Sequence, residues 1–311
     1  MAHLLSAIVN PVRVAVMGAG GVGSYLGGML SRSGVEVTLV CRGRHLAAIR
    51  SRGLSLSTPK ESFSLRIAAT DAPAGPVDVV LQGAKLYDLA SSSRQMLPLV
   101  GPQTMVVPVQ NGVTAPEEIA AITGAGRVVG GTVFLNAHVT EPGVVACKSE
   151  MNTVFLGELD GARSERTETF KKVCVEAGID ARIPADIRAE QWRKFIPVAG
   201  LSALASLARQ PIGPVREDPR LRALYRQAMQ EVAALAAAKG IVLEQDIVER
   251  MLAVAQRYKY DARVSMLEDL EAGKPLELEW LSGYVSREAA RLGVAVPFHD
   301  AAYACLKFLK R

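Results

Sequence analysis

Near its beginning the chain runs from a short apolar strand, Val12–Met17, directly into a loop with the spacing G-x-G-x-x-G. In a βαβ unit these glycines permit a tight turn, a close approach of backbone to a pyrophosphate, and close packing of helix on strand. A helix predicted over Gly21–Ser33, with Gly34 after it, and a strand over Glu36–Val40 complete the unit. The alternative is a glycine-rich turn in an ordinary α/β fold. We expect a Rossmann-type domain that binds a dinucleotide through Gly18, Ala19, Gly20, Gly21, Val22 and Gly23.

The end of the second strand bears on the choice of dinucleotide. Sites that prefer NAD usually place Asp or Glu there, to accept a hydrogen bond from the ribose 2′-hydroxyl. This chain has Cys41-Arg42-Gly43-Arg44 instead, and its next acid is Glu61. Guanidinium groups suit a 2′-phosphate, although two solvated surface arginines would give the same pattern. We therefore predict that the cofactor is NADP(H) and that Arg42 binds its 2′-phosphate.

Composition narrows the class of protein. At 311 residues, 49% of them hydrophobic and 22% charged, the chain is long enough for two globular domains. Its net charge of +5 is not gathered into a basic block, which argues against nucleic acid and suits an anionic cofactor and substrate. The four scattered cysteines indicate neither disulfides nor a metal site.

The sequence shows no pattern typical of a signal peptide or of a membrane-spanning segment. Residues 1–10 lack a positively charged start, and no apolar run reaches the length of a membrane span. We therefore expect a cytoplasmic protein with no membrane partner.

The chain divides into two regions of different periodicity. Up to residue 185, short Val-rich segments alternate with helical ones, and three of them are expected to be parallel strands: Val77–Gln82, Thr104–Gln110 and Arg127–Phe134. Within Thr140–Gly157, an antiparallel hairpin is expected between Val144–Cys147 and Thr153–Leu156. We predict a Rossmann domain over residues 11–185 and an all-helical domain over 186–311.

The second region has helical periodicity throughout. The first helix should begin after Asp186 and continue to Ala208, with a kink at Pro197. The further helices are expected over Pro219–Lys239, Leu243–Gln256, Ala262–Ala272, Glu277–Leu292 and Pro297–Leu309. The Ala-rich helix from Pro219 suits core packing or packing in a homodimer. The active site should lie between the two domains, at the carboxyl ends of the strands.

Several polar residues are candidates for that site. Lys85 and Asn111 follow two predicted strands at the same edge of the sheet, although Asn111-Gly112 is also a common turn dipeptide. Reduction of a ketone needs a proton donor, and a partly buried lysine such as Lys194 can serve because burial lowers its pKa. Glu277 could orient it. By spacing alone, the pattern favours ordinary charges on amphipathic helices for Lys194 and Glu277.

From Val12 to Leu309 the chain resembles the ketopantoate reductase (2-dehydropantoate 2-reductase) family. The matching elements occur in the family's order: residues 18–23, Arg42, Lys85, Gln110-Asn111-Gly112, Glu141-Pro142-Gly143, residues 187–194 with Trp192-Arg193-Lys194, Ser265-Met266-Leu267-Glu268-Asp269, Glu277 and residues 293–297. The resemblance implies a helical domain like the C-terminal domain of 6-phosphogluconate dehydrogenase. It also implies NADPH-dependent reduction of 2-dehydropantoate to (R)-pantoate in pantothenate biosynthesis.

The resemblance also implies roles for single residues. Lys194 would be the general acid, and Glu277 would contact the substrate hydroxyl or the cofactor. Asn111 would touch cofactor and substrate, and Arg42 and Lys85 would hold the cofactor. Ser265 would bind the substrate carboxylate, and Ser202 stands at a further substrate-binding position.

The chain departs from the family on the substrate side. Val198, Ser202 and Ile212 stand where the family typically has asparagine. Loss of hydrogen-bonding amides changes specificity, because polar groups of the substrate are left unpaired. One alternative is therefore an NADPH-dependent reductase of a different 2-oxo acid. Another, of a different class, is an NADP(H)-binding sensor without catalysis.

Overall fold

The computed structural model describes residues 12–309, so the segment 1–10 considered above lies outside the described residues. Its central element is a five-stranded parallel sheet in the order β5-β2-β1-β6-β7. The strands are β1 (Arg13–Met17), β2 (Glu36–Val40), β5 (Ala68–Thr70), β6 (Val77–Gln82) and β7 (Val100–Pro108). The order reverses between β1 and β6, which is where ligands bind in sheets of this kind. The predicted Rossmann-type architecture is confirmed.

Helices alternate with the strands in this part of the chain. They are α1 (Gly21–Arg32), α2 (Gly43–Arg52), α3 (Leu89–Gln95), α4 (Ala115–Thr123) and α5 (Glu165–Glu176), with short 3-10 turns η1 (Leu86–Asp88), η2 (Leu97–Leu99) and η3 (Ala125–Arg127). Buried Val14 and Val16 of β1 pack in one core with Leu26 and Leu30 of α1. The chain therefore enters the glycine loop from a fixed strand and leaves it through a fixed helix.

The expected hairpin between Val144–Cys147 and Thr153–Leu156 is wrong. The antiparallel partner of β10 (Val144–Cys147) is β9 (Ala137–Glu141), across the turn at Gly143, which has φ +81°. β10 also pairs with β3 (Leu54–Ser57), which pairs with β4 (Ser62–Leu65). The turn residues Glu141-Pro142-Gly143 lie before β10, so the preceding residues are the ones that fold back on it.

The segment predicted as the second hairpin strand belongs to another sheet. β11 (Thr153–Gly157) lies between β8 (Gly130–Phe134), with which it is antiparallel, and β12 (Asp180–Arg182). The expectation that Arg127–Phe134 runs as a parallel strand holds only for the bridge between Val128 and Val106 of β7. Beyond that bridge, β8 turns away from the main sheet and contributes its end to the domain boundary.

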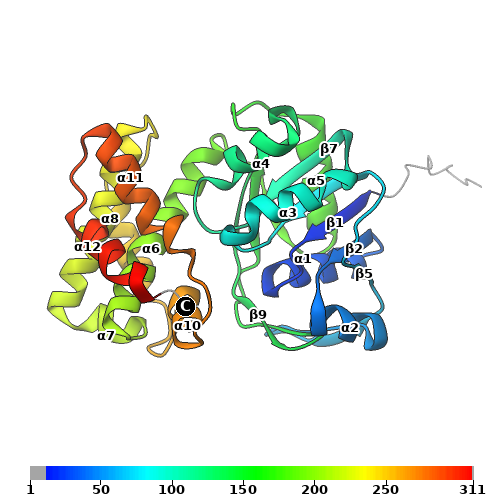
Figure 1. Cartoon of the computed structure of the whole chain (residues 1–311), viewed down its shortest axis with the longest axis horizontal. Coiled ribbons are helices and arrows are strands. Elements are labelled where there is room, and N and C mark those ends of the chain that lie inside the picture. The colour runs from blue at the N-terminus through cyan, green and yellow to red at the C-terminus, as the bar shows by residue number, and fades with distance from the viewer. Residues whose placement is uncertain (1–11, 310–311) are drawn as a thin grey trace, which may run out of the picture.

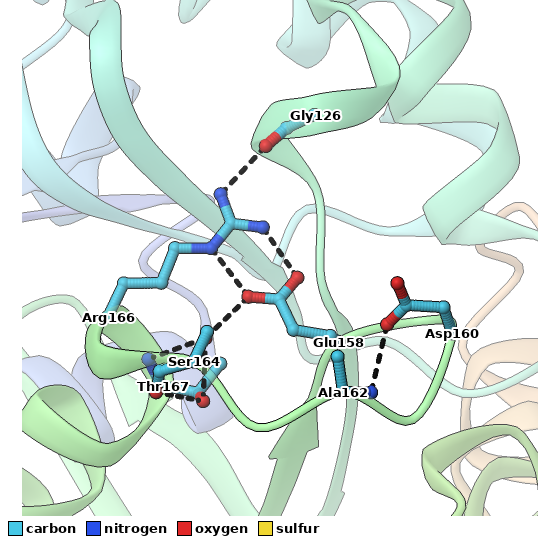
Figure 2. Close-up of polar contacts among 7 residues, drawn as sticks. All are labelled: Gly126, Glu158, Asp160, Ala162, Ser164, Arg166 and Thr167. Atoms are coloured by element: carbon cyan, nitrogen blue, oxygen red, sulfur yellow. Dashed lines mark hydrogen bonds and ion pairs between the residues drawn. The ribbon is translucent and has the colours of Figure 1, made fainter.

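An ion pair fixes the connection that follows β11 (Figure 2). Glu158 accepts hydrogen bonds from Nε and Nη2 of Arg166 at 2.7 and 2.6 Å, and Nη1 of the same arginine donates to the carbonyl of Gly126. Ser164 caps α5 by accepting from the Thr167 amide, and its hydroxyl donates to Glu158. These contacts join η3, β11 and α5 into one unit.

The rest of the chain is helical and forms a separate body beside the sheet (Figure 1). Its elements are α6 (Ile187–Ala208), α7 (Ile212–Glu217), α8 (Pro219–Ala238), α9 (Ile247–Ala255), α10 (Ser265–Glu271), η4 (Glu277–Glu279), α11 (Ser282–Leu292), α12 (Pro297–Leu306) and η5 (Lys307–Leu309). Asp186 and Asp218 cap α6 and α8, as predicted. The expected single helix over Glu277–Leu292 is wrong, because the chain makes the turn η4 and bends at Leu281 before α11 starts.

Small residues explain how the long helices pack. A Cβ atom on Gly200 of α6 would lie 3.2 Å from Cβ of Ala228 on α8, so the two helices approach closely there. Ala228, Met229 and Val232 of α8 are buried in the core that contains Phe195 of α6. The Ala-rich helix therefore serves the core of the helical domain.

Candidate active site

The glycine loop lies at the carboxyl end of β1. Gly18 has φ +76°, and a Cβ there would lie 2.5 Å from the backbone of Ala84 after β6. A Cβ on Gly20, by contrast, would meet no protein atom within 4 Å. The first amides of α1, at Gly21, Val22 and Gly23, precede the helical hydrogen-bond ladder that begins at the Ser24 amide. This open backbone with free helix amides fits a pyrophosphate.

Gly21 has a different structural reason to be glycine. A Cβ there would lie 2.0 Å from the carbonyl oxygen of Ala137, because β9 passes across the start of α1. Gly23 likewise packs against the carbonyl of Gly18 and the side chain of Val16. Gly18, Gly21 and Gly23 therefore each lie against other protein atoms, and Gly20 is the glycine of this loop that faces open space.

Arg42 lies at the end of β2, where it immediately precedes α2. Its side chain is 85% exposed, and its Nη2 lies 3.2 Å from Oδ2 of Asp88 at the end of η1. Arg44 is exposed in the first turn of α2. Both guanidinium groups therefore stand at the edge of the sheet where the second strand of a dinucleotide-binding unit meets the adenosine end of the ligand.

A cluster of three charges joins the sheet domain to the helical domain. The Lys85 ammonium donates to Oδ2 of Asp269 at 2.8 Å and to Oε2 of Glu277 at 3.2 Å. The other carboxylate oxygen of Glu277 accepts from the Leu86 amide at 3.0 Å. Burial acts to lower the pKa of Lys85, but the charges of Glu277 and Asp269 outweigh it and raise that pKa. Lys85 is therefore cationic at all ordinary pH values.

Lys194 lies in the second turn of α6 and points to the end of β8. Its Nζ donates to the carbonyl oxygen of Val133 at 2.5 Å and lies 5.6 Å from the ring centre of Phe134. Burial lowers the pKa of Lys194 to about 8, against the opposing charge of Glu277. A lysine with that pKa can give up and regain a proton near neutrality.

Asn111 follows β7 at the same edge of the sheet. It is partly buried, and a Cβ on the next residue, Gly112, would lie 3.6 Å from the carbonyl oxygen of Trp280, just after η4. The turn that carries Asn111 therefore adjoins the segment that carries Glu277. Gly112 has φ +95°, so the turn interpretation of the dipeptide is also satisfied.

The two predicted substrate-binding serines lie in different surroundings. Ser265 is exposed at the start of α10, one turn before Asp269. Ser202 is buried within α6, about two turns after Lys194, and Val198 lies between them, partly buried against the helical core. Ile212 is 4% exposed and belongs to that core. No contact brings either serine to Lys194 among the described residues.

Sequence reasoning gave no role to three partners in this site. Asp269 was visible in the S-M-x-x-D element, and its spacing of eight residues from Glu277 was the only signal. The Leu86 amide and the Val133 carbonyl are backbone groups, which no side-chain pattern reveals. Within residues 12–309, no group of three or more acidic, histidine or cysteine side chains is arranged to hold a metal ion, and no helix has the length and apolarity to cross a membrane.

Comparison with known proteins matches both parts of the chain. The family model for "Ketopantoate reductase PanE/ApbA" covers residues 14–161, and that for its C-terminal part covers residues 186–310. A 2-dehydropantoate 2-reductase from Mesorhizobium japonicum is 30% identical, over 96% of this chain and 98% of its own. A crystal structure of 2-dehydropantoate 2-reductase from Geobacter metallireducens is 31% identical, with a TM-score of 0.90 over 96% of this chain and 99% of its own.

A more distant structure shares the fold. D-mandelate dehydrogenase, solved with NADH and anilino(oxo)acetate, superposes with a TM-score of 0.89 at 20% identity and covers 96% of this chain and 98% of its own. The fold, the site and the matches to the family together define an oxidoreductase of the two-domain type. The chain belongs to the ketopantoate reductase family.

Proposed function

We propose that this protein reduces ketopantoate to (R)-pantoate with NADPH, and that Lys194 donates the proton. The observation that carries the proposal is the partly buried Lys194 amine at the domain boundary, with its pKa lowered to about 8 and the Glu277 charge near it. The family's enzymes reduce small 2-oxo acids, and the charged and polar residues at the domain boundary would supply the groups that such a reaction needs.

The cofactor would be held along the carboxyl edge of the sheet. The α1 amides and the open backbone at Gly20 would bind the pyrophosphate, and Arg42 would pair with the 2′-phosphate. Lys85 and Asn111, which follow the neighbouring strands β6 and β7, would contact the ribose and nicotinamide side. The absence of acids from residue 41 to residue 60 supports NADPH over NADH.

When bound, the cofactor would supply the hydride that reduces the keto carbon. As the carbonyl oxygen gains negative charge, Lys194 donates one proton to it, which gives the 2-hydroxy acid and leaves a neutral amine. Solvent then returns a proton to Lys194. Glu277 favours the protonated lysine, and its contacts with Lys85 and Leu86 hold it in place. Ser265 would bind the substrate carboxylate, with Asn111 and Ser202 completing the substrate side.

A second candidate follows from the aliphatic residues on that side. Val198 and Ile212 place hydrocarbon where the family typically has amides, and both contribute to the apolar core of the helical domain. Aliphatic side chains at these positions would favour a 2-oxo acid with an alkyl or aryl substituent over one with a hydroxymethyl group. The reaction would be the same and only the substrate would differ.

The deciding experiment is NADPH oxidation by the purified protein with ketopantoate, beside a panel of alkyl and aryl 2-oxo acids. A preference for ketopantoate supports the first candidate, and a preference for an apolar member supports the second. If NADPH binds but no 2-oxo acid is reduced, the proposal is wrong and the sensor hypothesis gains support.

A further inference from the structure

The Lys85 ammonium forms ion pairs with two carboxylates of the helical domain, those of Asp269 and Glu277. The contact with Asp269 is the shorter, at 2.8 Å against 3.2 Å for Glu277. The carboxylates are 15% and 9% exposed and the lysine is 38% exposed, so the cluster is partly shielded from water. One cation faces two anions, and the cluster therefore carries a net negative charge.

The negative charge of Glu277 acts to raise the pKa of Lys194, against the effect of burial. β8, the strand that Lys194 contacts, carries no titratable side chain. Other acids on the elements around α6 are engaged elsewhere: Glu190, Glu244, Glu271, Glu279 and Glu288 pair with lysine or arginine, and Glu231 accepts from the amides of α12. The strength of the electrostatic interaction between Glu277 and Lys194 therefore depends on the position of the Lys85 ammonium.

We propose that Asp269 is a positioning residue for the proton donor: by holding Lys85, it leaves the negative charge of Glu277 to act on the Lys194 ammonium. Without Asp269, Lys85 would rest on Glu277 alone and neutralise it. Lys194 would then lose its proton at a lower pH. This inference rests on the proposed function, because it takes Lys194 as the donor.

The test is Asp269→Asn in the full chain, a change that keeps the size of the side chain. Two readouts are measured against pH: kcat/KM for the best 2-oxo acid at saturating NADPH, and competitive acetylation of Lys194 followed by mass spectrometry. We expect the alkaline midpoint of both to move down by about 0.5–1 pH unit. Glu268→Gln is the matched control, because it removes one negative charge from an exposed position of the same helix and should leave both midpoints unchanged.

The double variant Lys85→Met/Asp269→Asn separates charge balance from structure. With the cation gone, Glu277 is no longer neutralised, and the Lys194 midpoint should return to the wild-type value or above it. An unchanged midpoint in Asp269→Asn, or a midpoint that stays low in the double variant, would overturn the proposal. Failure to reduce any 2-oxo acid would contradict the proposed function instead, and the acetylation midpoint would still decide the role of Asp269.

Discussion

The Lys194 ammonium donates to the carbonyl oxygen of Val133 at 2.5 Å, and this hydrogen bond crosses the boundary between the helical domain and the sheet domain. Val133 is in β8, the strand that leaves the main sheet and pairs with β11. The proposed proton donor is therefore placed by both domains, and its environment exists only when they are packed together.

Lys194 should set the alkaline limit of the reaction. Since the donor must be protonated, kcat/KM for reduction should fall about tenfold per pH unit above pH 8 and be independent of this group below it. Lys194→Ala should reduce kcat by about 10²–10⁴-fold while the Kd for NADPH stays near the wild-type value. Steady-state rates and fluorescence titration measure both. A profile that stays flat to strongly alkaline pH would exclude this lysine as the acid.

Alanine substitutions at Gly20 and Gly21 should have different effects on stability and on cofactor binding. Gly20→Ala places its methyl in open space, so the free energy of unfolding should change by no more than about 1 kcal/mol while the Kd for NADPH rises at least about tenfold. Gly21→Ala forces a methyl against the Ala137 carbonyl and should destabilise the fold by about 2 kcal/mol or more. Urea denaturation and NADPH titration distinguish them. Equal loss of stability in both variants would contradict this division of roles.

Arg42 should discriminate between the two nicotinamide cofactors. Arg42→Ala removes a guanidinium that pairs with the 2′-phosphate, so the Kd for NADPH should rise about 10–100-fold and that for NADH should change little. Arg50→Ala is the control: Arg50 lies on α2, the helix that begins directly after Arg42, and its Nη2 pairs with Asp71 at 3.3 Å. If both variants weaken NADPH binding equally, the effect is a general loss of positive charge rather than recognition by Arg42.

Val198 should control the polarity of the accepted substrate. Val198→Asn restores an amide one turn from Lys194, and the ratio of kcat/KM for ketopantoate to that for an alkyl 2-oxo acid should rise about tenfold. Val198→Ala changes the volume without adding an amide and serves as the control. The same shift in both variants would mean that space, not hydrogen bonding, determines the preference.

His299 should make the fold less stable in mild acid. It is fully buried, with Nδ1 3.1 Å from the Ser282 hydroxyl and Nε2 3.1 Å from the Ala228 carbonyl, and burial lowers its pKa to about 4. The unfolded chain binds this proton near pH 6.5, so stability present above that pH should be lost as the pH falls towards 4, by about 2–3 kcal/mol. Urea denaturation at several pH values measures the slope. His299→Gln should flatten it, and an unchanged slope would assign the acid sensitivity to other groups.

Local sequence signals predicted the βαβ unit and the caps of the long helices, because each depends on residues close in the chain. The bounds of β2 and β6, the glycine loop, and the caps Asp186 and Asp218 all follow from such signals. The hairpin prediction was wrong for the opposite reason. β10 and β11 have similar alternating patterns, and their partners, β9 and β3 for one and β8 and β12 for the other, are chosen by packing between distant segments.

The sequence by itself determined the fold class and the family, and it predicted the kind of ligand and the kind of chemistry from a strand followed by G-x-G-x-x-G, basic residues after β2, and a lysine and a glutamate in the helical part. It could not determine which charges meet. Lys85 is 184 residues from Asp269 and 192 from Glu277, and Lys194 is 61 from Val133. Such contacts form only when the two domains bury their facing surfaces. The same burial lowers the pKa of Lys194, so the tertiary structure decides whether that lysine is an ordinary surface cation or a group that can exchange a proton near neutral pH.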